Sequence, residues 1–311
     1  MAVSKRADLL TRTIKVLKKY YKPVPPAADR TLIEHLLFAC CLENSMPPAA
    51  EQSYATLKHQ FYDWNEVRVS TIGELAEVLQ ALNDPEDAAR RLRGVLQSVF
   101  ESLYAFDLEA LKKHNMSQAV KQLQSHAGTT PFAVSYVVQA ALGGHAIPVN
   151  EGAIRALVVV GAITAAEANQ GRVPGLERAL PKIRGIESGS LLHQWGVDFR
   201  CHPYAPATRK RLLEIAADCK DRLPKRPASK PAKVCPPDGT VAAADAPPAK
   251  ENASEQGTPA KEPAQSAKKT SGRGTAGDKK AATPKQADTA KAKPRHTKKS
   301  PGKRLSQRKP R

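Results

Sequence analysis

The pattern that most constrains the fold is an amphipathic stripe in residues 84–104. Apolar side chains recur there at helical spacing, and charged side chains occupy the opposite face. Pro85 and the acidic pair after it stand at the start, where proline and negative charge favour a helix N-terminus. The apolar face consists of Leu92, Val95, Leu96, Val99, Phe100 and Leu103. A stripe of this length predicts a helical domain.

Helical periodicity extends over most of the chain before residue 224. A first stripe should end before Pro23, because proline interrupts a helix. Its members are Leu10, Ile14, Leu17 and Tyr21. Further helical patterns cover residues 32–41, 71–82, 107–126, 133–142 and 205–223. No run alternates as a half-buried strand does, and no long-period repeat is present. The sequence therefore predicts an all-α bundle of about ten helices.

Composition argues against a membrane protein and a secreted one. No apolar run approaches the roughly 18 residues of a membrane-spanning helix. An amphipathic pattern rather than an apolar run follows the basic start, so we expect no signal peptide. The five cysteines (Cys40, Cys41, Cys201, Cys219 and Cys235) show no repeated spacing. Their odd count favours a reducing compartment. We expect a cytoplasmic, nucleoid-associated protein with no membrane partner.

The last part of the chain differs sharply from the rest. Residues 224–311 contain 22 Lys and Arg against 7 Asp and Glu, 13 prolines and no aromatic residue. Such a segment buries too little apolar surface to order itself, so residues 1–223 are the expected domain and 224–311 a disordered basic tail. The tail is either a solvated linker or an arm that follows DNA phosphates, which its single-signed charge favours. The candidate phosphate-binding residues there are Lys279, Lys280, Lys298, Lys299, Lys303 and Arg304.

Residues 115–160 hold the most informative motif. A helix is followed by the turn Ser125-His126-Ala127-Gly128-Thr129-Thr130-Pro131-Phe132 and by the apolar helix 133–142. Gly128 supplies an unusual backbone angle, and Thr130 and Pro131 suit the first positions of a helix. Backbone amides at such a turn form a site for one DNA phosphate. We therefore predict a helix-hairpin-helix at about 115–144, with Gly128, Thr129 and Thr130 contacting DNA.

This arrangement resembles the helix-hairpin-helix DNA glycosylases, in particular the endonuclease III branch. The family hairpin reads roughly Leu-Pro-Gly-Val-Gly-X-Lys-Thr-Ala, with an aspartate at a fixed distance after its lysine. Here the segment Ile147-Pro148-Val149-Asn150 lies at that same distance from the hairpin, without a gap. Likeness extends over about residues 30–220, including Leu36–Ala39 and Trp195–Cys201. The resemblance implies a two-lobed helical bundle and a place in base-excision repair.

The two residues that carry the family chemistry are replaced here. Phe132 stands at the lysine position, and a phenyl ring can neither attack the sugar nor form a Schiff base. Asn150 stands at the aspartate position, and an amide carries no charge and is no general base at neutral pH. Asn150 does suit a helix N-cap before the apolar stripe that follows it. We therefore expect no glycosylase or lyase chemistry of the usual kind.

Three neighbouring residues are candidate surrogates. Glu151 follows the lost carboxylate directly, but one helical step turns its side chain by about 100°, and the alternative is a solvated helix charge. His126 and His145 flank the hairpin helix as candidate bases, although a histidine at a helix edge is usually at the surface or hydrogen-bonded.

The family's iron–sulfur cluster needs four thiolates with the spacing Cys-X6-Cys-X2-Cys-X5-Cys. Counted from Cys201, the remaining positions are Thr208, Arg211 and Ala217. Cys219 lies out of register, and His202 adds one weak ligand. We therefore expect no metal and no cofactor, with Cys201 and Cys219 buried. Cys40 and Cys41 lie in an apolar run and are expected in the core.

Three functions remain open. The first is a DNA-binding protein of this superfamily without the usual chemistry, which binds bent or damaged DNA mainly through its phosphates. The second is an active glycosylase or abasic-site lyase that uses non-standard residues. The third is a nucleoid-associated scaffold that binds DNA through its tail alone.

Overall fold

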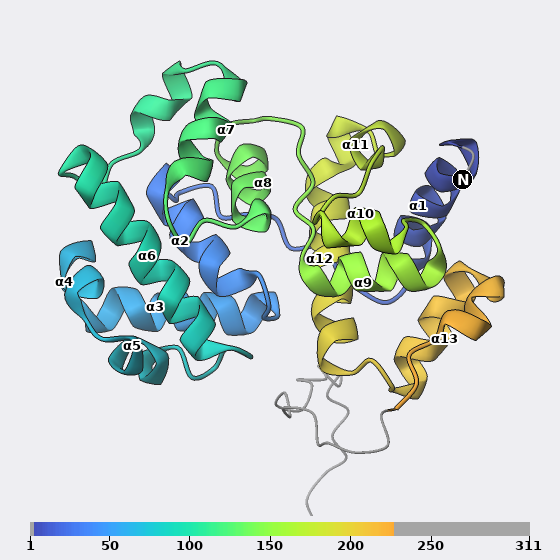
Figure 1. Ribbon diagram of the computed structural model, residues 1–311. Helices are drawn as coiled ribbons and strands as arrows, with labels where there is room; N and C mark the ends of the chain where they lie inside the picture. Colours follow the sequence, from blue (N-terminus) through green and yellow to red (C-terminus); the bar gives the residue numbers. More distant parts are fainter. Residues whose placement is uncertain (1–2, 227–311) are drawn as a thin grey trace, which may run out of the picture. The chain divides into compact units, whose positions relative to one another are not determined.

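The computed structural model describes residues 3–226, and the predictions for the basic tail therefore lie outside the described residues. The described part is helical and contains no strand, as predicted (Figure 1). It has thirteen α-helices and three 3-10 helices, more than the ten or so expected. The additional helices are mainly short ones, such as α4, α10 and α11. No helix in this part is long and apolar enough to cross a membrane.

The first half of the chain supplies one buried core. It consists of residues between Leu32 and Val138, and its centre is the almost wholly apolar helix α2. A capping box at Thr31 and Glu34 starts that helix. The helices of this core are α2 (Leu32–Leu42), α3 (Pro47–Gln60), α4 (Trp64–Val69), α5 (Ile72–Val78), α6 (Pro85–Leu103), α7 (Met116–Ser125) and α8 (Pro131–Ala140), with the 3-10 helix η1 (Glu109–Lys113).

A second buried core is built from the N-terminal helix and the second half of the chain. Leu10 and Leu17 of α1 pack in it with Trp195 and residues of α9 and α13. Figure 1 shows α1 on the side of α12 and α13 rather than beside α2. Its helices are α1 (Val3–Leu17), α9 (Glu151–Val160), α10 (Ala165–Asn169), α11 (Leu176–Ala179), α12 (Gly185–Cys201) and α13 (Pro206–Ile215), with the 3-10 helices η2 (Lys182–Arg184) and η3 (Ala217–Arg222). The two cores confirm the expected two-lobed bundle.

Several expected boundaries are wrong. The pattern over 107–126 forms two helices, η1 and α7, because Asn115 caps a new helix by accepting a hydrogen bond from the Gln118 amide. The pattern over 205–223 likewise divides into α13 and η3, and α5 is shorter than the pattern over 71–82. The long stripe of α6 forms as predicted, from Pro85 to Leu103.

Candidate functional site

The predicted hairpin joins α7 to α8 and lies against α6. Gly128 has φ +83°, a left-handed conformation, as its place in the turn predicted. A Cβ atom there would lie 2.6 Å from the Arg91 carbonyl oxygen, so the turn approaches the α6 backbone closely. On α6, a Cβ atom added at Gly94 would lie 3.4 Å from the Ala127 carbonyl oxygen, at the limit of ordinary contact. Glycine is therefore required at position 128 for both conformation and packing.

The two hairpin threonines are directed inward. Thr130 is the N-cap of α8: its Oγ1 accepts from the Ala133 amide at 3.1 Å and donates to Glu43 Oε2 at 3.0 Å. The Thr129 hydroxyl is buried and makes no hydrogen bond within the described residues. The hairpin therefore offers its backbone, more than these hydroxyls, to a ligand.

Phe132 lies in the first turn of α8 and is buried. Its ring centroid is 5.4 Å from that of His193 on α12. It lines a cavity of about 40 Å³ together with Pro148, Gly189 and His193. A ligand pocket usually has roughly 300 Å³ or more, so this space accommodates no more than water. The phenyl ring at the lysine position thus helps to close the space between α8 and α12.

Asn150 caps α9, as predicted, and is 1% exposed. Its Oδ1 accepts from the Ala153 amide at 3.0 Å. Its Nδ2 donates to the main-chain carbonyl oxygens of Glu43 at 3.0 Å and His193 at 3.2 Å. Gly196 leaves room for this side chain, since a Cβ there would lie 1.8 Å from Asn150 Oδ1. The amide therefore joins α9 to α2 and α12 through both of its ends.

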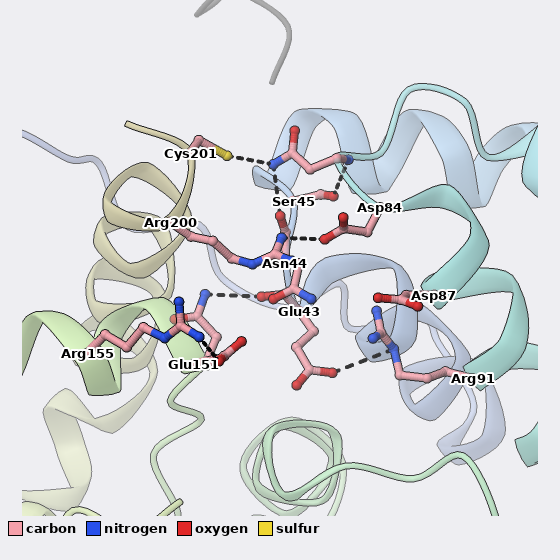
Figure 2. Close-up of polar contacts among 12 residues, drawn as sticks. Glu43, Asn44, Ser45, Asp84, Asp87, Arg91, Glu151, Arg155, Arg200 and Cys201 are labelled. Carbon is pink, nitrogen blue, oxygen red and sulfur yellow. Dashed lines mark hydrogen bonds and ion pairs between the residues drawn. The ribbon is translucent and has the colours of Figure 1, made fainter. Parts of the chain in front are cut away.

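The structure adds a residue that the sequence did not suggest. Glu43 follows α2 as its C-cap, with its main chain bonded to Asn150 and its side chain bonded to Thr130. Its Oε2 also lies 3.7 Å from Arg91 Nε, and the Glu43 side chain is 15% exposed. Figure 2 shows this side chain pointing between Glu151 on α9 and Arg91 on α6. Glu43 therefore contacts both Thr130 at the start of α8 and Asn150 at the start of α9.

Burial raises the pKa of Glu43, since removal from water disfavours the charged form. Arg91 and the Thr130 hydroxyl oppose this shift and stabilise the carboxylate, while the charge of Glu151 adds to it. Arg91 Nε is buried and has no hydrogen-bond partner among the described residues. Arg91 Nη2 donates to the Cys40 carbonyl oxygen at 3.2 Å. The two charges thus lie close together without a direct hydrogen bond.

The three candidate catalytic residues Glu151, His126 and His145 do not lie together in one site. Glu151 is exposed at the start of α9 and forms an ion pair with Arg155, as expected of a solvated helix charge. His126 is buried under the hairpin, and burial lowers its pKa; one ring nitrogen lies 3.4 Å from Ser98 Oγ. His145 Nε2 lies 2.9 Å and 3.0 Å from the carbonyl oxygens of Glu177 and Leu180.

The positions of the expected metal ligands hold other interactions. Thr208 donates its hydroxyl proton to the His202 carbonyl oxygen at 2.8 Å, and Arg211 forms an ion pair with Asp198. These residues do not fit an iron–sulfur cluster. Within residues 3–226, no group of three or more His, Cys, Asp or Glu side chains could hold a metal ion.

One expectation about the cysteines is wrong and three are confirmed. Cys201 is half-buried rather than buried. Cys40, Cys41 and Cys219 are free and buried, as predicted. The six candidate phosphate contacts in the tail, Lys279, Lys280, Lys298, Lys299, Lys303 and Arg304, lie outside the described residues.

Comparison with known proteins gives a consistent fold. No family model matches the sequence, and no curated protein matches it. Among solved structures, a thermostable thymine-DNA glycosylase matches with a TM-score of 0.50 and 13% identity, over 71% of this chain and 100% of that one. An endonuclease III–DNA complex matches with a TM-score of 0.49 and 14% identity, over 68% of this chain and 94% of that one.

The first of these matches spans the whole of the glycosylase chain. At 13% identity the likeness concerns architecture only. The chain has the fold of the helix-hairpin-helix DNA glycosylases.

Proposed function

We propose that this protein binds duplex DNA through its glycosylase fold and does not use the amine-and-carboxylate chemistry of endonuclease III. The observation that carries the proposal is the state of Asn150. Its amide is buried and donates to two main-chain carbonyl oxygens, so the residue at the family's aspartate position connects helices and carries no charge. Phe132, at the amine position, is packed against His193.

The hairpin supports DNA as the partner. Its turn is formed by Gly128, and α8 begins directly after it, an arrangement whose backbone amides favour a phosphate. The basic tail adds a salt-dependent attraction without sequence preference. The proposal includes a cytoplasmic, nucleoid-associated location. It includes no iron–sulfur cluster, because Thr208 and Arg211 supply no thiolate.

The test compares the full chain with residues 1–242, which retain the whole compact unit that contains the described residues. Both are titrated at low salt against a plain duplex and a duplex carrying one abasic site. We expect the shorter chain to bind more weakly than the full chain but still to prefer the abasic duplex. Equal affinity for the two duplexes would contradict recognition of damaged DNA. Complete loss of binding would favour the tail-only scaffold.

A charge variant tests the hairpin itself. Ala127 is exposed at the turn, and Ala127→Glu places a negative charge where a phosphate should lie. We expect DNA affinity of residues 1–242 to fall about tenfold, which corresponds to about 1.4 kcal/mol. Gln170→Glu adds the same charge at an exposed position of the other core and should change affinity little. Equal effects of the two variants would remove the hairpin from the interface.

A further inference from the structure

A cleft with a positively charged lining lies at the surface of the second core. It is bounded by the loop between α12 and α13, by α13 and η3, and by residues 223–226, and its volume is about 680 Å³. Ligand pockets in proteins usually have about 300–1,000 Å³, so this cleft is large enough for a small molecule. Four charged side chains line it, and all are cations: Arg209, Lys220, Lys225 and Arg226.

The charge of this cleft is not neutralised by the protein. No Asp or Glu lines it, and none of its four cations has an ion-pair partner within residues 3–226. The acidic residues of η3, Asp218 and Asp221, lie outside the lining, and Asp218 is ion-paired with Arg222. Like charges around one concave space raise its electrostatic potential and attract an anion.

Two other surface clefts show that this charge distribution is not general. Both are lined by cations and carboxylates together, with volumes of about 520 Å³ beside α1 and about 450 Å³ at the start of α6. In the first, Lys19 is ion-paired with Glu214, and in the second, Arg90 is ion-paired with Glu86 and Asp87. Of these three clefts, the one at α13 alone has charges of a single sign.

Both walls of the cleft at α13 are fixed by contacts outside it. Thr208 donates to the His202 carbonyl oxygen at 2.8 Å, which holds the loop after α12 against α13. On the other side, Cys219 is buried in the second core, and Arg222 Nε donates to the Val159 carbonyl oxygen at 2.8 Å, so η3 is anchored. A ligand therefore meets walls that are already in place, which lowers the cost of binding.

An aromatic ring lies beside the cations. Tyr204 lines the cleft, is 40% exposed, and makes no aromatic or cation–π contact within residues 3–226. Pro203 and Pro206 line the cleft with it and add apolar surface. An open aromatic face next to positive charge is the combination on which proteins stack a nucleobase while holding its phosphates.

We propose that this cleft binds a free nucleotide with two or more phosphates, its base on Tyr204 and its phosphates on Arg209 and Lys220. A guanidinium holds a phosphate through two parallel hydrogen bonds, and an ammonium adds a point charge. DNA is another source of phosphate, but a duplex keeps its bases stacked inside and offers none to Tyr204. The inference goes beyond DNA binding and does not rest on it.

Calorimetric titration of the full chain at low salt with adenosine triphosphate and with inorganic triphosphate tests the proposal. We expect Arg209→Glu to weaken the binding of both about tenfold, since a repulsion replaces an attraction. Tyr204→Ala should weaken adenosine triphosphate binding about tenfold and leave inorganic triphosphate binding unchanged. Lys113→Glu makes the same kind of charge change at an exposed position of η1 and should alter neither affinity.

The basic tail is present in every variant, so differences among the variants report on the cleft. The replaced side chains are all exposed, and circular dichroism shows whether the variants are folded. Absence of saturable adenosine triphosphate binding by the wild-type chain, or wild-type affinity in Arg209→Glu, overturns the proposal. Wild-type affinity for adenosine triphosphate in Tyr204→Ala overturns the assignment of a nucleotide.

A parallel titration with a short DNA single strand and its duplex separates the two sources of phosphate. If Arg209→Glu weakens DNA binding and leaves adenosine triphosphate binding unchanged, the cleft holds DNA phosphates and the proposal is wrong. If the wild-type chain binds adenosine triphosphate but neither DNA, the proposed function fails and the nucleotide site stands. The two failures are therefore distinguishable.

Discussion

At the scale of single residues, the hydrogen bonds of Asn150 show why an aspartate would be unfavourable at this position. Its Nδ2 donates to the carbonyl oxygens of Glu43 and His193, and its Oδ1 accepts from Ala153. An ionised carboxylate could still cap α9, but it would face two carbonyl oxygens as a third acceptor. Gly196 lies so close that a Cβ atom added there would be 1.8 Å from Asn150 Oδ1.

We therefore expect Asn150→Asp to lower the free energy of unfolding by about 3 kcal/mol at neutral pH, because it leaves two carbonyls unsatisfied and buries a charge. Chemical denaturation measures this loss. Asn115→Asp is the matched control, since Asn115 is also an N-cap but is exposed at the start of α7. That variant should be neutral or slightly stabilising. Similar losses in both variants would contradict the role assigned to Asn150.

The residue type at Asn150 was sufficient to predict the N-cap of α9, whereas the loss of the usual chemistry stays a prediction. The role of Glu43 could not be predicted in the same way. A single glutamate after an apolar run is typical of many helix ends, and its partners Thr130 and Asn150 lie far away in the sequence. Only the packing of α2 against α8 and α9 brings the three together.

At the scale of elements, a polar network connects Tyr21, in the segment after α1, to α12 and α13. Asp198 accepts from the Tyr21 hydroxyl at 2.7 Å and forms an ion pair with Arg211. Arg211 also donates to the Tyr21 hydroxyl at 2.9 Å. The side chains of Asp198 and Arg211 are 9% and 18% exposed. This network joins segments that no metal site of the described residues connects.

Replacing Arg211 with methionine should lower the free energy of unfolding by about 3 kcal/mol, because it leaves the Asp198 carboxylate without its cation. The double variant Asp198→Asn, Arg211→Met should lose less than the sum of the two single changes. Arg155→Met removes an exposed pair within one helix and should cost less than about 0.5 kcal/mol. If the double variant loses as much free energy of unfolding as the two single variants together, Asp198 and Arg211 do not interact and the network is excluded.

Helices with a continuous apolar stripe could be predicted from sequence alone, as α2, α6 and α8 show. Boundaries were predicted less well. The break before α7 depends on the cap at Asn115, and the N-terminal helix belongs to the second core through contacts with distant α12 and α13. Local periodicity contains no information about such distant partners, so the sequence did not predict that α1 belongs to the second core. The additional short helices were missed because they are too short to show a periodic stripe.

At the scale of the whole molecule, His193 couples stability to pH. It joins the two cores by hydrogen bonding to the Leu42 carbonyl oxygen at 2.8 Å, and burial lowers its pKa to about 4. The unfolded chain therefore binds a proton near pH 6.5 that the folded chain does not bind until about pH 4. Stability is greatest above pH 6.5 and falls as the pH is lowered through this window.

We expect the free energy of unfolding to fall by about 3 kcal/mol between pH 7 and pH 4 on account of His193. His35 and His126, whose pKa values are also lowered by burial, act in the same direction. His193→Gln should flatten the dependence even though it lowers stability at neutral pH. His59→Gln, at an exposed position of α3, should leave the slope as it is. An unchanged slope in the His193 variant would contradict this assignment.

Borohydride trapping on a duplex with one abasic site shows whether this glycosylase fold binds DNA without amine chemistry. The full chain is incubated with that duplex at low salt in the presence of borohydride, with binding followed in parallel. With Phe132 at the amine position, we predict a bound complex, no covalent adduct and no nicked strand. A trapped adduct would contradict the account, because it would show that another amine of this chain attacks the sugar.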